Sequence, residues 1–148
     1  MQSINFNTGY KTYAINGDES NVIRVNLADP NLFKRMEEVL EYMDTFKDEI
    51  TDDMAVSEVY EKFDNLVKNK IDYAFGEGTS KAVFGNVNCL TVANDEGECI
   101  FETFLNAIMP IIYNDVNEAA KNQNRHISDM VDKGKLDKYV QQIKETVQ

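Results

Sequence analysis

The sequence predicts a mainly α-helical domain with a small N-terminal β-hairpin, an α+β fold whose amphipathic helices pack as a bundle. Three observations favour this fold. Apolar residues alternate over residues 3–27, they recur at spacings of three and four in several stretches of residues 29–132, and turn or capping residues separate these segments. We therefore divide the chain into a β element at residues 1–28, a helical core of the same domain at 29–132, and a polar C-terminal tail or short helix at 133–148.

The β element is predicted to form two or three short antiparallel strands. Asn7-Thr8-Gly9 indicates a first tight turn, and Asn16-Gly17 is the pair that two-residue hairpins favour. Residues 22–27 then alternate and contain the β-branched residues that strands prefer. Because a lone hairpin is marginally stable in water, we expect it to pack on the helices or on another subunit.

Two long amphipathic helices are predicted to follow. Asp29 can cap the first helix, with Pro30 at its first position, and this helix should run to about residue 48. Residues 51–53, Thr-Asp-Asp, offer a cap for the second helix, which Gly76 should end as a left-handed residue. The short connection between the two helices predicts an antiparallel pair.

Three glycines, Gly76, Gly78 and Gly85, are predicted to form the structural turn at the centre of the chain. In this interpretation Thr79 or Ser80 caps a short helical segment that Gly85 ends. The chain should then be irregular to about residue 94, with Cys89, Leu90 and Val92 pointing inward. A further amphipathic helix is expected from Glu98 to about residue 132.

Composition excludes several classes of function. The formal net charge is −11, with 26 acidic and 15 basic side chains, which argues against nucleic acid as a partner. No apolar run approaches the roughly 20 residues that a membrane span needs, and the first residues lack the pattern of a secretory signal. We expect the two cysteines, Cys89 and Cys99, to be buried thiols. The acidic surface suits a soluble protein that exposes apolar surface to partners, although it is equally consistent with simple solvation.

No catalytic residue, cofactor site or metal site is predicted. Gly76-Glu77-Gly78-Thr79-Ser80-Lys81 has the wrong glycine spacing for a phosphate loop, and Glu77 would repel phosphate. Residues 94–98 resemble part of a calcium loop, but that register would place Val92 and Thr103 at ligand positions. His126 is the only histidine, nothing near Cys89 in the sequence would activate its thiol for a pairing with His126, and the abundant carboxylates fall on polar helix faces. We therefore do not expect an enzyme.

Residues 71–85 resemble the central pattern of the tail assembly chaperones of long-tailed phages. In that family a helix ends in a Phe-Gly-Glu-Gly-like turn and a Val-Phe-Gly-like step follows, as in residues 75–78 and 83–85 of this chain. The flanking segments fit the β entry, the first helix start and the aromatic helix of that family; they are Tyr13–Asp18, Ile23–Asn26, Asp29–Asn31 and Phe101–Pro110. The resemblance spans about residues 4–120 and leaves out residues 121–148.

The resemblance implies a non-enzymatic chaperone in the host bacterial cytoplasm that coats the tape-measure protein and helps recruit the tail-tube protein. It also implies a homo-oligomer that is absent from the mature virion, often accompanied by a longer frameshifted form. No client-binding residues can be carried over, so the protein-binding residues stay unknown. Met36, Met43 and Met54 could supply an adaptable apolar surface, although Met36 and Met43 are better explained as core residues.

The alternative function is a small acidic phage-encoded inhibitor or adaptor that binds a basic surface of a host protein. Its support is the net charge of −11. Salt separates the two functions, because binding through charge weakens with ionic strength whereas binding through apolar contact does not.

Overall fold

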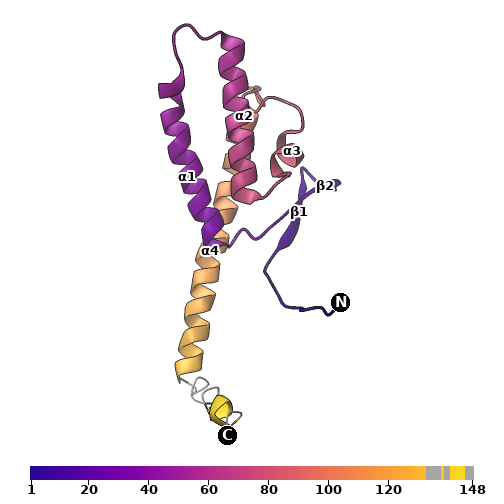
Figure 1. Cartoon of the computed structure of the whole chain (residues 1–148), viewed down its shortest axis with the longest axis vertical. Helices are drawn as coiled ribbons and strands as arrows, with labels where there is room; N and C mark the ends of the chain where they lie inside the picture. Colours follow the sequence, from indigo (N-terminus) through magenta and orange to yellow (C-terminus); the bar gives the residue numbers. More distant parts are fainter. Residues whose placement is uncertain (133–137, 139–140, 146–148) are drawn as a thin grey trace.

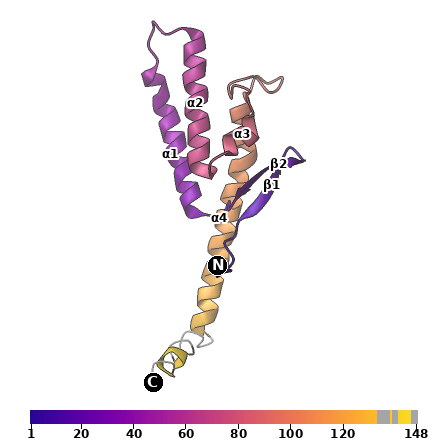
Figure 2. The same cartoon turned by 45° about the vertical axis from the view of Figure 1, so that its right-hand side comes forward.

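The computed structural model describes residues 1–132, 138 and 141–145. Helices α1 (Pro30–Phe46) and α2 (Val56–Phe75) lie side by side as the predicted antiparallel pair (Figures 1 and 2), and α4 (Ile100–Asp132) runs behind them in the view of Figure 1. The hairpin and the short helix α3 (Thr79–Phe84) flank this group. The predicted fold class, mostly helical with an N-terminal antiparallel hairpin, is confirmed.

The hairpin consists of β1 (Lys11–Ile15) and β2 (Asp18–Val25), with Tyr13 opposite Ile23. Asn16 and Gly17 both have positive φ, 52° and 78°, as the tight two-residue hairpin turn requires, so the predicted Asn-Gly turn is confirmed. Residues 1–10 form neither strand nor helix. The optional third strand and the tight turn at residues 7–9 are therefore absent from the described chain, because the first ten residues pair with no strand.

The start of α1 follows the prediction. The Asp29 carboxylate accepts a hydrogen bond from the Asn31 N–H at 2.9 Å, which satisfies one of the unpaired donors of the first turn. The α-helix ends at Phe46, two residues earlier than expected, and the short 3₁₀ helix η1 (Lys47–Glu49) follows.

The predicted cap of α2 is wrong. The N-cap residue is Ala55, which has no capping side chain, and α2 begins at Val56. The reason lies in the residues before it: the Met54 N–H donates to the Thr51 carbonyl at 3.1 Å, so residues 51–54 close a turn of their own.

One hydrophobic core joins the hairpin, α1, α2, α3 and α4. Its centre contains fully buried side chains from several elements; they are Leu27, Leu32, Met36, Val39, Val67, Ile71, Cys89 and Ile112. Phe104 of α4 makes edge-to-face contacts with Phe75 at 5.9 Å and Phe84 at 6.0 Å between ring centroids. This aromatic group fixes the end of α2 and the end of α3 against α4.

Helix α4 begins at Ile100, two residues later than expected, and continues through Pro110. Before it, Cys89 is buried and Leu90 is half-buried, but Val92 is 65% exposed, so its predicted inward position is wrong. Val92 forms an isolated antiparallel β-bridge with Cys99, yet Cys99 is buried and Val92 is exposed at the surface of the loop. None of the described helices is long and apolar enough to cross a membrane.

The expected C-terminal tail falls mainly outside the described residues, which omit 133–137, 139–140 and 146–148. Within it, residues 141–145 are helical.

Candidate protein-binding site

The glycine turn is a structural joint between α2 and α3. Gly76 ends α2 as predicted, but it is not the predicted left-handed residue. Its φ of 117° and ψ of 154° form a conformation open essentially to glycine alone. Gly78 is the left-handed residue, at φ 89°, and it is the N-cap of α3. Thr79 and Ser80 therefore do not cap α3 as predicted. Gly85 ends α3 with φ 59°, and its N–H donates to the Lys81 carbonyl at 2.8 Å.

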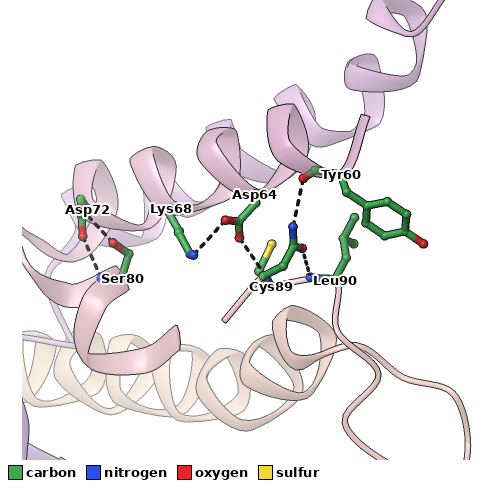
Figure 3. Close-up of polar contacts among 8 residues, drawn as sticks. Tyr60, Asp64, Lys68, Asp72, Ser80, Cys89 and Leu90 are labelled. Atoms are coloured by element: carbon green, nitrogen blue, oxygen red, sulfur yellow. Dashed lines mark hydrogen bonds and ion pairs between the residues drawn. The ribbon is translucent and has the colours of Figure 1, made fainter. Parts of the chain in front are cut away.

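A row of polar residues on α2 holds the chain that follows the joint. Asp64, Lys68 and Asp72 are spaced four apart and so lie on one side of the helix (Figure 3). The Asp64 carboxylate accepts hydrogen bonds from the Cys89 N–H at 2.8 Å and from the Lys68 ammonium at 2.9 Å. The Asp72 carboxylate likewise accepts hydrogen bonds from the N–H and the hydroxyl of Ser80. These carboxylates have structural partners, which leaves them poorly placed for acid–base chemistry.

The electrostatics of Asp64 agree with this role. Burial tends to raise the pKa of its carboxyl, but the hydrogen bonds from Lys68 and the Cys89 N–H outweigh burial and hold the pKa below its ordinary value. Asp64 is therefore stabilised as a carboxylate in the folded protein.

The two thiols are buried and protonated. Burial, followed by the negative charge of Asp64, raises the pKa of Cys89 to about 12. Burial also raises the pKa of Cys99. His126 is exposed on α4. Phe101 lies 25 residues before it in the same helix, and the Phe101 N–H donates to the Cys89 carbonyl. The helical rise then separates Cys89 from His126 by roughly 37 Å, so the two form no nucleophile pair.

The segment that resembles a calcium loop is a hydrogen-bonded turn. The Asn94 side-chain oxygen accepts the Glu98 N–H at 3.1 Å, and the Glu98 carboxylate accepts from the amides of Asn94 and Asn106, both at 3.0 Å. Among the residues that the structure describes, no group of three or more His, Cys, Asp or Glu side chains could hold a metal ion.

The three methionines do not form an exposed surface. Met36 is fully buried and Met43 packs against the core, which agrees with their interpretation as core residues. Met54 is half-buried, and its sulfur accepts the Thr51 N–H at 3.2 Å. Apolar surface for a partner has to come from other residues.

One such surface is an apolar groove of about 350 Å³ between β1 and the first half of α4, which we call the hairpin groove. None of its lining residues carries a charged side chain. The Tyr13 hydroxyl is neutral at pH 7, and burial, followed by the charge of Asp115, raises its pKa further. The lining residues are Tyr13, Ala14, Ile15, Asn16, Ile23, Val83, Ile100, Thr103, Phe104, Ala107, Ile108 and Ile111.

A second surface runs from the middle of α4 towards its C-terminal end, which extends away from α1, α2 and the hairpin (Figures 1 and 2). Tyr113, Val116, Ala120 and Ile127 are spaced by three, four and seven residues, the spacing of a helix-pairing seam. We call these four residues the α4 seam. Tyr113 is 48% exposed although its ring meets Phe33 of α1 edge-to-face at 5.3 Å between centroids, Val116 packs against the core, and Ile127 is 58% exposed.

A third surface is acidic and lies at the connection between α1 and α2. Between residues 44 and 61 the chain has seven carboxylates and one lysine. All seven carboxylate residues are exposed, and we call them the acidic tip; they are Asp44, Asp48, Glu49, Asp52, Asp53, Glu58 and Glu61.

Sequence reasoning missed all three surfaces. The expected helix from Glu98 to about residue 132 carries no assignment of its apolar residues to core or surface, yet the small residues Thr103 and Ala107 are a signal for the groove. The three–four spacing through Val116 and Ala120 was a signal for the seam. The cluster of acids around residues 48–53 was visible, but only as part of the total charge.

Residues 18–146 match a family model described as a family of unknown function (DUF6673), so the chain belongs to that family. The match begins at the first residue of β2 and includes all the helices. No curated protein and no solved structure gives a significant match.

Proposed function

We propose that this member of the DUF6673 family is a non-enzymatic phage tail assembly chaperone, which coats the tape-measure protein and helps recruit tail-tube subunits. The resemblance of residues 71–85 to the central turn of such chaperones supports this proposal. The structural observation that carries it is the α4 seam, an apolar stripe on a helix that extends beyond the packed body. The protein acts as a homo-oligomer in the host bacterial cytoplasm and is absent from the mature virion.

The seam suits a long helical client. Its spacing places Tyr113, Ala120 and Ile127 along one side of α4, where a second helix can pack its own apolar stripe. Ala120 is small, which allows the backbones to approach closely at the middle of the contact. Exposed charged residues flank the stripe, such as the Glu118–Lys121 pair at 3.5 Å, and keep the free helix soluble.

The buried polar groups favour binding over catalysis. Asp64, Asp72 and Cys89 are hydrogen-bonded within the fold, and the thiol of Cys89 is protonated. A coating protein needs stable subunits and accessible apolar surface, and this distribution of polar and apolar groups supplies both.

The alternative, an acidic inhibitor or adaptor of a basic host surface, is favoured by the acidic tip. Seven exposed carboxylates at one end of the α1–α2 pair would attract a basic partner. The tip and the seam lie on different elements, so variants can separate the two functions.

Co-expression with a phage tape-measure protein tests the proposal. The two proteins should co-purify, and the client should be insoluble or degraded when expressed alone. Ile127→Glu should abolish co-purification, because it places a charge in the apolar seam. Asn114→Glu is the matched control: it adds the same charge at an exposed residue about 140° around the helix. A client that is soluble alone and never co-purifies would contradict the proposed function.

A further inference from the structure

The first ten residues expose apolar side chains outside the fold. Ile4 is 89% exposed and Phe6 is 75% exposed, and Tyr10 is also exposed. Ile4 and Phe6 are two residues apart, so an extended chain presents both on one side. Figure 1 shows this segment leaving the body beyond the hairpin. We call residues 1–10 the N-terminal arm.

Contacts at its base hold the arm beside β2. The Asn26 amide donates to the Thr8 carbonyl at 3.2 Å, and the Arg24 guanidinium lies 4.5 Å from the centre of the Tyr10 ring. Gly9 has φ 77°, and a Cβ at this position would lie 2.5 Å from the Asn26 amide nitrogen. The chain therefore bends at Gly9, while Thr8 is held by Asn26 and Tyr10 is held by Arg24.

The hairpin groove offers a surface of matching chemistry. Four consecutive residues from Tyr13 to Asn16 line it, so the groove follows the edge of β1 as well as one face. β1 pairs only with β2 in the two-stranded sheet, which leaves its outer edge able to accept another strand. Beside this edge lie Phe104, Ile108 and Ile111 of α4, which supply apolar contact.

The arm cannot easily reach the groove of its own chain. β1 runs from Lys11 towards the Asn16–Gly17 turn, and the groove lies at the turn end. The arm precedes Lys11 and leaves from the opposite end of the strand (Figure 1). A second copy of the chain has no such restriction.

Charge also favours a second copy as the occupant. The arm contains no charged side chain, and neither does the groove lining, although 28% of the residues in the chain are charged. Two copies that each carry a net charge of −11 repel one another, so a contact between neutral surfaces is the one that costs least.

We propose that the N-terminal arm of one copy binds the hairpin groove of a second copy, with Ile4 and Phe6 inserted beside β1 and α4. The contact joins two different surfaces, so each bound pair keeps one free arm and one free groove unless the exchange is mutual. This inference rests on the proposed function only in one respect, namely that the protein is a homo-oligomer. Self-association is measured without the client, so a failure here leaves client binding to be judged separately.

The test is the mass of the full-length protein by sedimentation, in the absence of client. The wild-type protein should be oligomeric. Phe6→Asp should give the mass of one chain, and so should Ala107→Glu, which places a charge in the groove at an exposed residue. Val56→Asp is the control, since Val56 is exposed at the start of α2 and belongs to neither the arm nor the groove lining, and it should leave the oligomer intact.

Mixing the two monomeric variants makes the test specific. Phe6→Asp keeps an intact groove and Ala107→Glu keeps an intact arm, so together they should form a heterodimer and nothing larger. Circular dichroism checks that each variant is folded. A monomeric wild-type protein, an oligomer that survives Phe6→Asp, or a mixture that does not associate would each overturn the proposal.

Discussion

The carboxylate of Asp72 accepts two hydrogen bonds from Ser80, one from its backbone N–H at 2.8 Å and one from its hydroxyl at 3.0 Å. Asp72 lies in the last turn of α2, and Ser80 lies in the first turn of α3. One residue thus supplies a cap for the next helix across the glycine turn, where α3 has no capping side chain of its own.

We predict that Asp72→Ala lowers the free energy of unfolding by about 2 kcal/mol, because it removes two charge-assisted hydrogen bonds from a partly buried site. Urea unfolding followed by circular dichroism measures this change. Glu77→Ala, at an exposed residue of the same turn, should change the free energy by less than about 0.5 kcal/mol. Equal effects of the two variants would show that Asp72 has no special role.

Acid should weaken the contact of Asp64. The folded protein holds the pKa of this carboxyl below its ordinary value, so Asp64 contributes stability above the unfolded pKa of about 3.9, and this contribution is lost as pH falls through the folded pKa. The difference in free energy of unfolding between wild type and Asp64→Asn should therefore be largest at neutral pH and shrink at pH 3. A difference that stayed constant between these pH values would contradict this explanation.

Local signals made part of the fold predictable. Asp29 caps α1, and Asn16 and Gly17 form the hairpin turn, because the partners of these residues are their immediate neighbours. The prediction that Thr79 or Ser80 caps α3 is wrong, because Gly78 is the N-cap and the Ser80 hydroxyl bonds to Asp72. That bond depends on the way the chain turns between two helices, which residue spacing alone does not specify.

The candidate surfaces depended on longer-range packing. The Asp64–Cys89 bond joins residues 25 apart, and the hairpin groove joins β1 to a helix that begins 85 residues after Ile15. Amphipathic spacing shows that Ile108 and Ile127 belong to apolar stripes, yet Ile108 is buried and Ile127 is exposed. The difference arises because other elements cover Ile108 but not the far end of α4, and the sequence of α4 itself does not contain this information.

The thiol of Cys89 should be unreactive in the folded protein. Burial and the charge of Asp64 raise its pKa from 9.0 to about 12, which lowers the thiolate fraction at pH 8 by roughly a thousandfold. A chromogenic disulfide reagent should label neither Cys89 nor Cys99 within the time that labels both in urea. Cys99→Ser isolates the signal of Cys89, and rapid labelling of this variant without denaturant would contradict the burial argument.

The two glycines of the joint should differ in their tolerance of side chains. Gly76 has a backbone conformation that only glycine adopts readily, so Gly76→Ala should cost about 2 kcal/mol of stability. Gly78 is left-handed with open space around it, so Gly78→Asn should cost less than about 1 kcal/mol, and Gly78→Val more. Urea unfolding of the three variants gives the order. Equal costs at Gly76 and Gly78 would contradict the conformational explanation.

Salt should distinguish the two candidate functions. A client held on the α4 seam makes apolar contacts, so raising sodium chloride from 0.1 to 1 M, which shortens the screening length from about 10 to 3 Å, should change its dissociation constant by less than about threefold. The double variant Asp52→Asn with Asp53→Asn, in the acidic tip, should have an equally small effect on the dissociation constant of the client. Asp95→Asn with Glu96→Gln removes the same charge from an exposed turn and serves as the control. A different result would be binding that weakens more than about tenfold in salt, and that weakens with the tip variant but not with its control. The partner would then be held by charge, and the acidic inhibitor or adaptor would replace the chaperone as the better explanation.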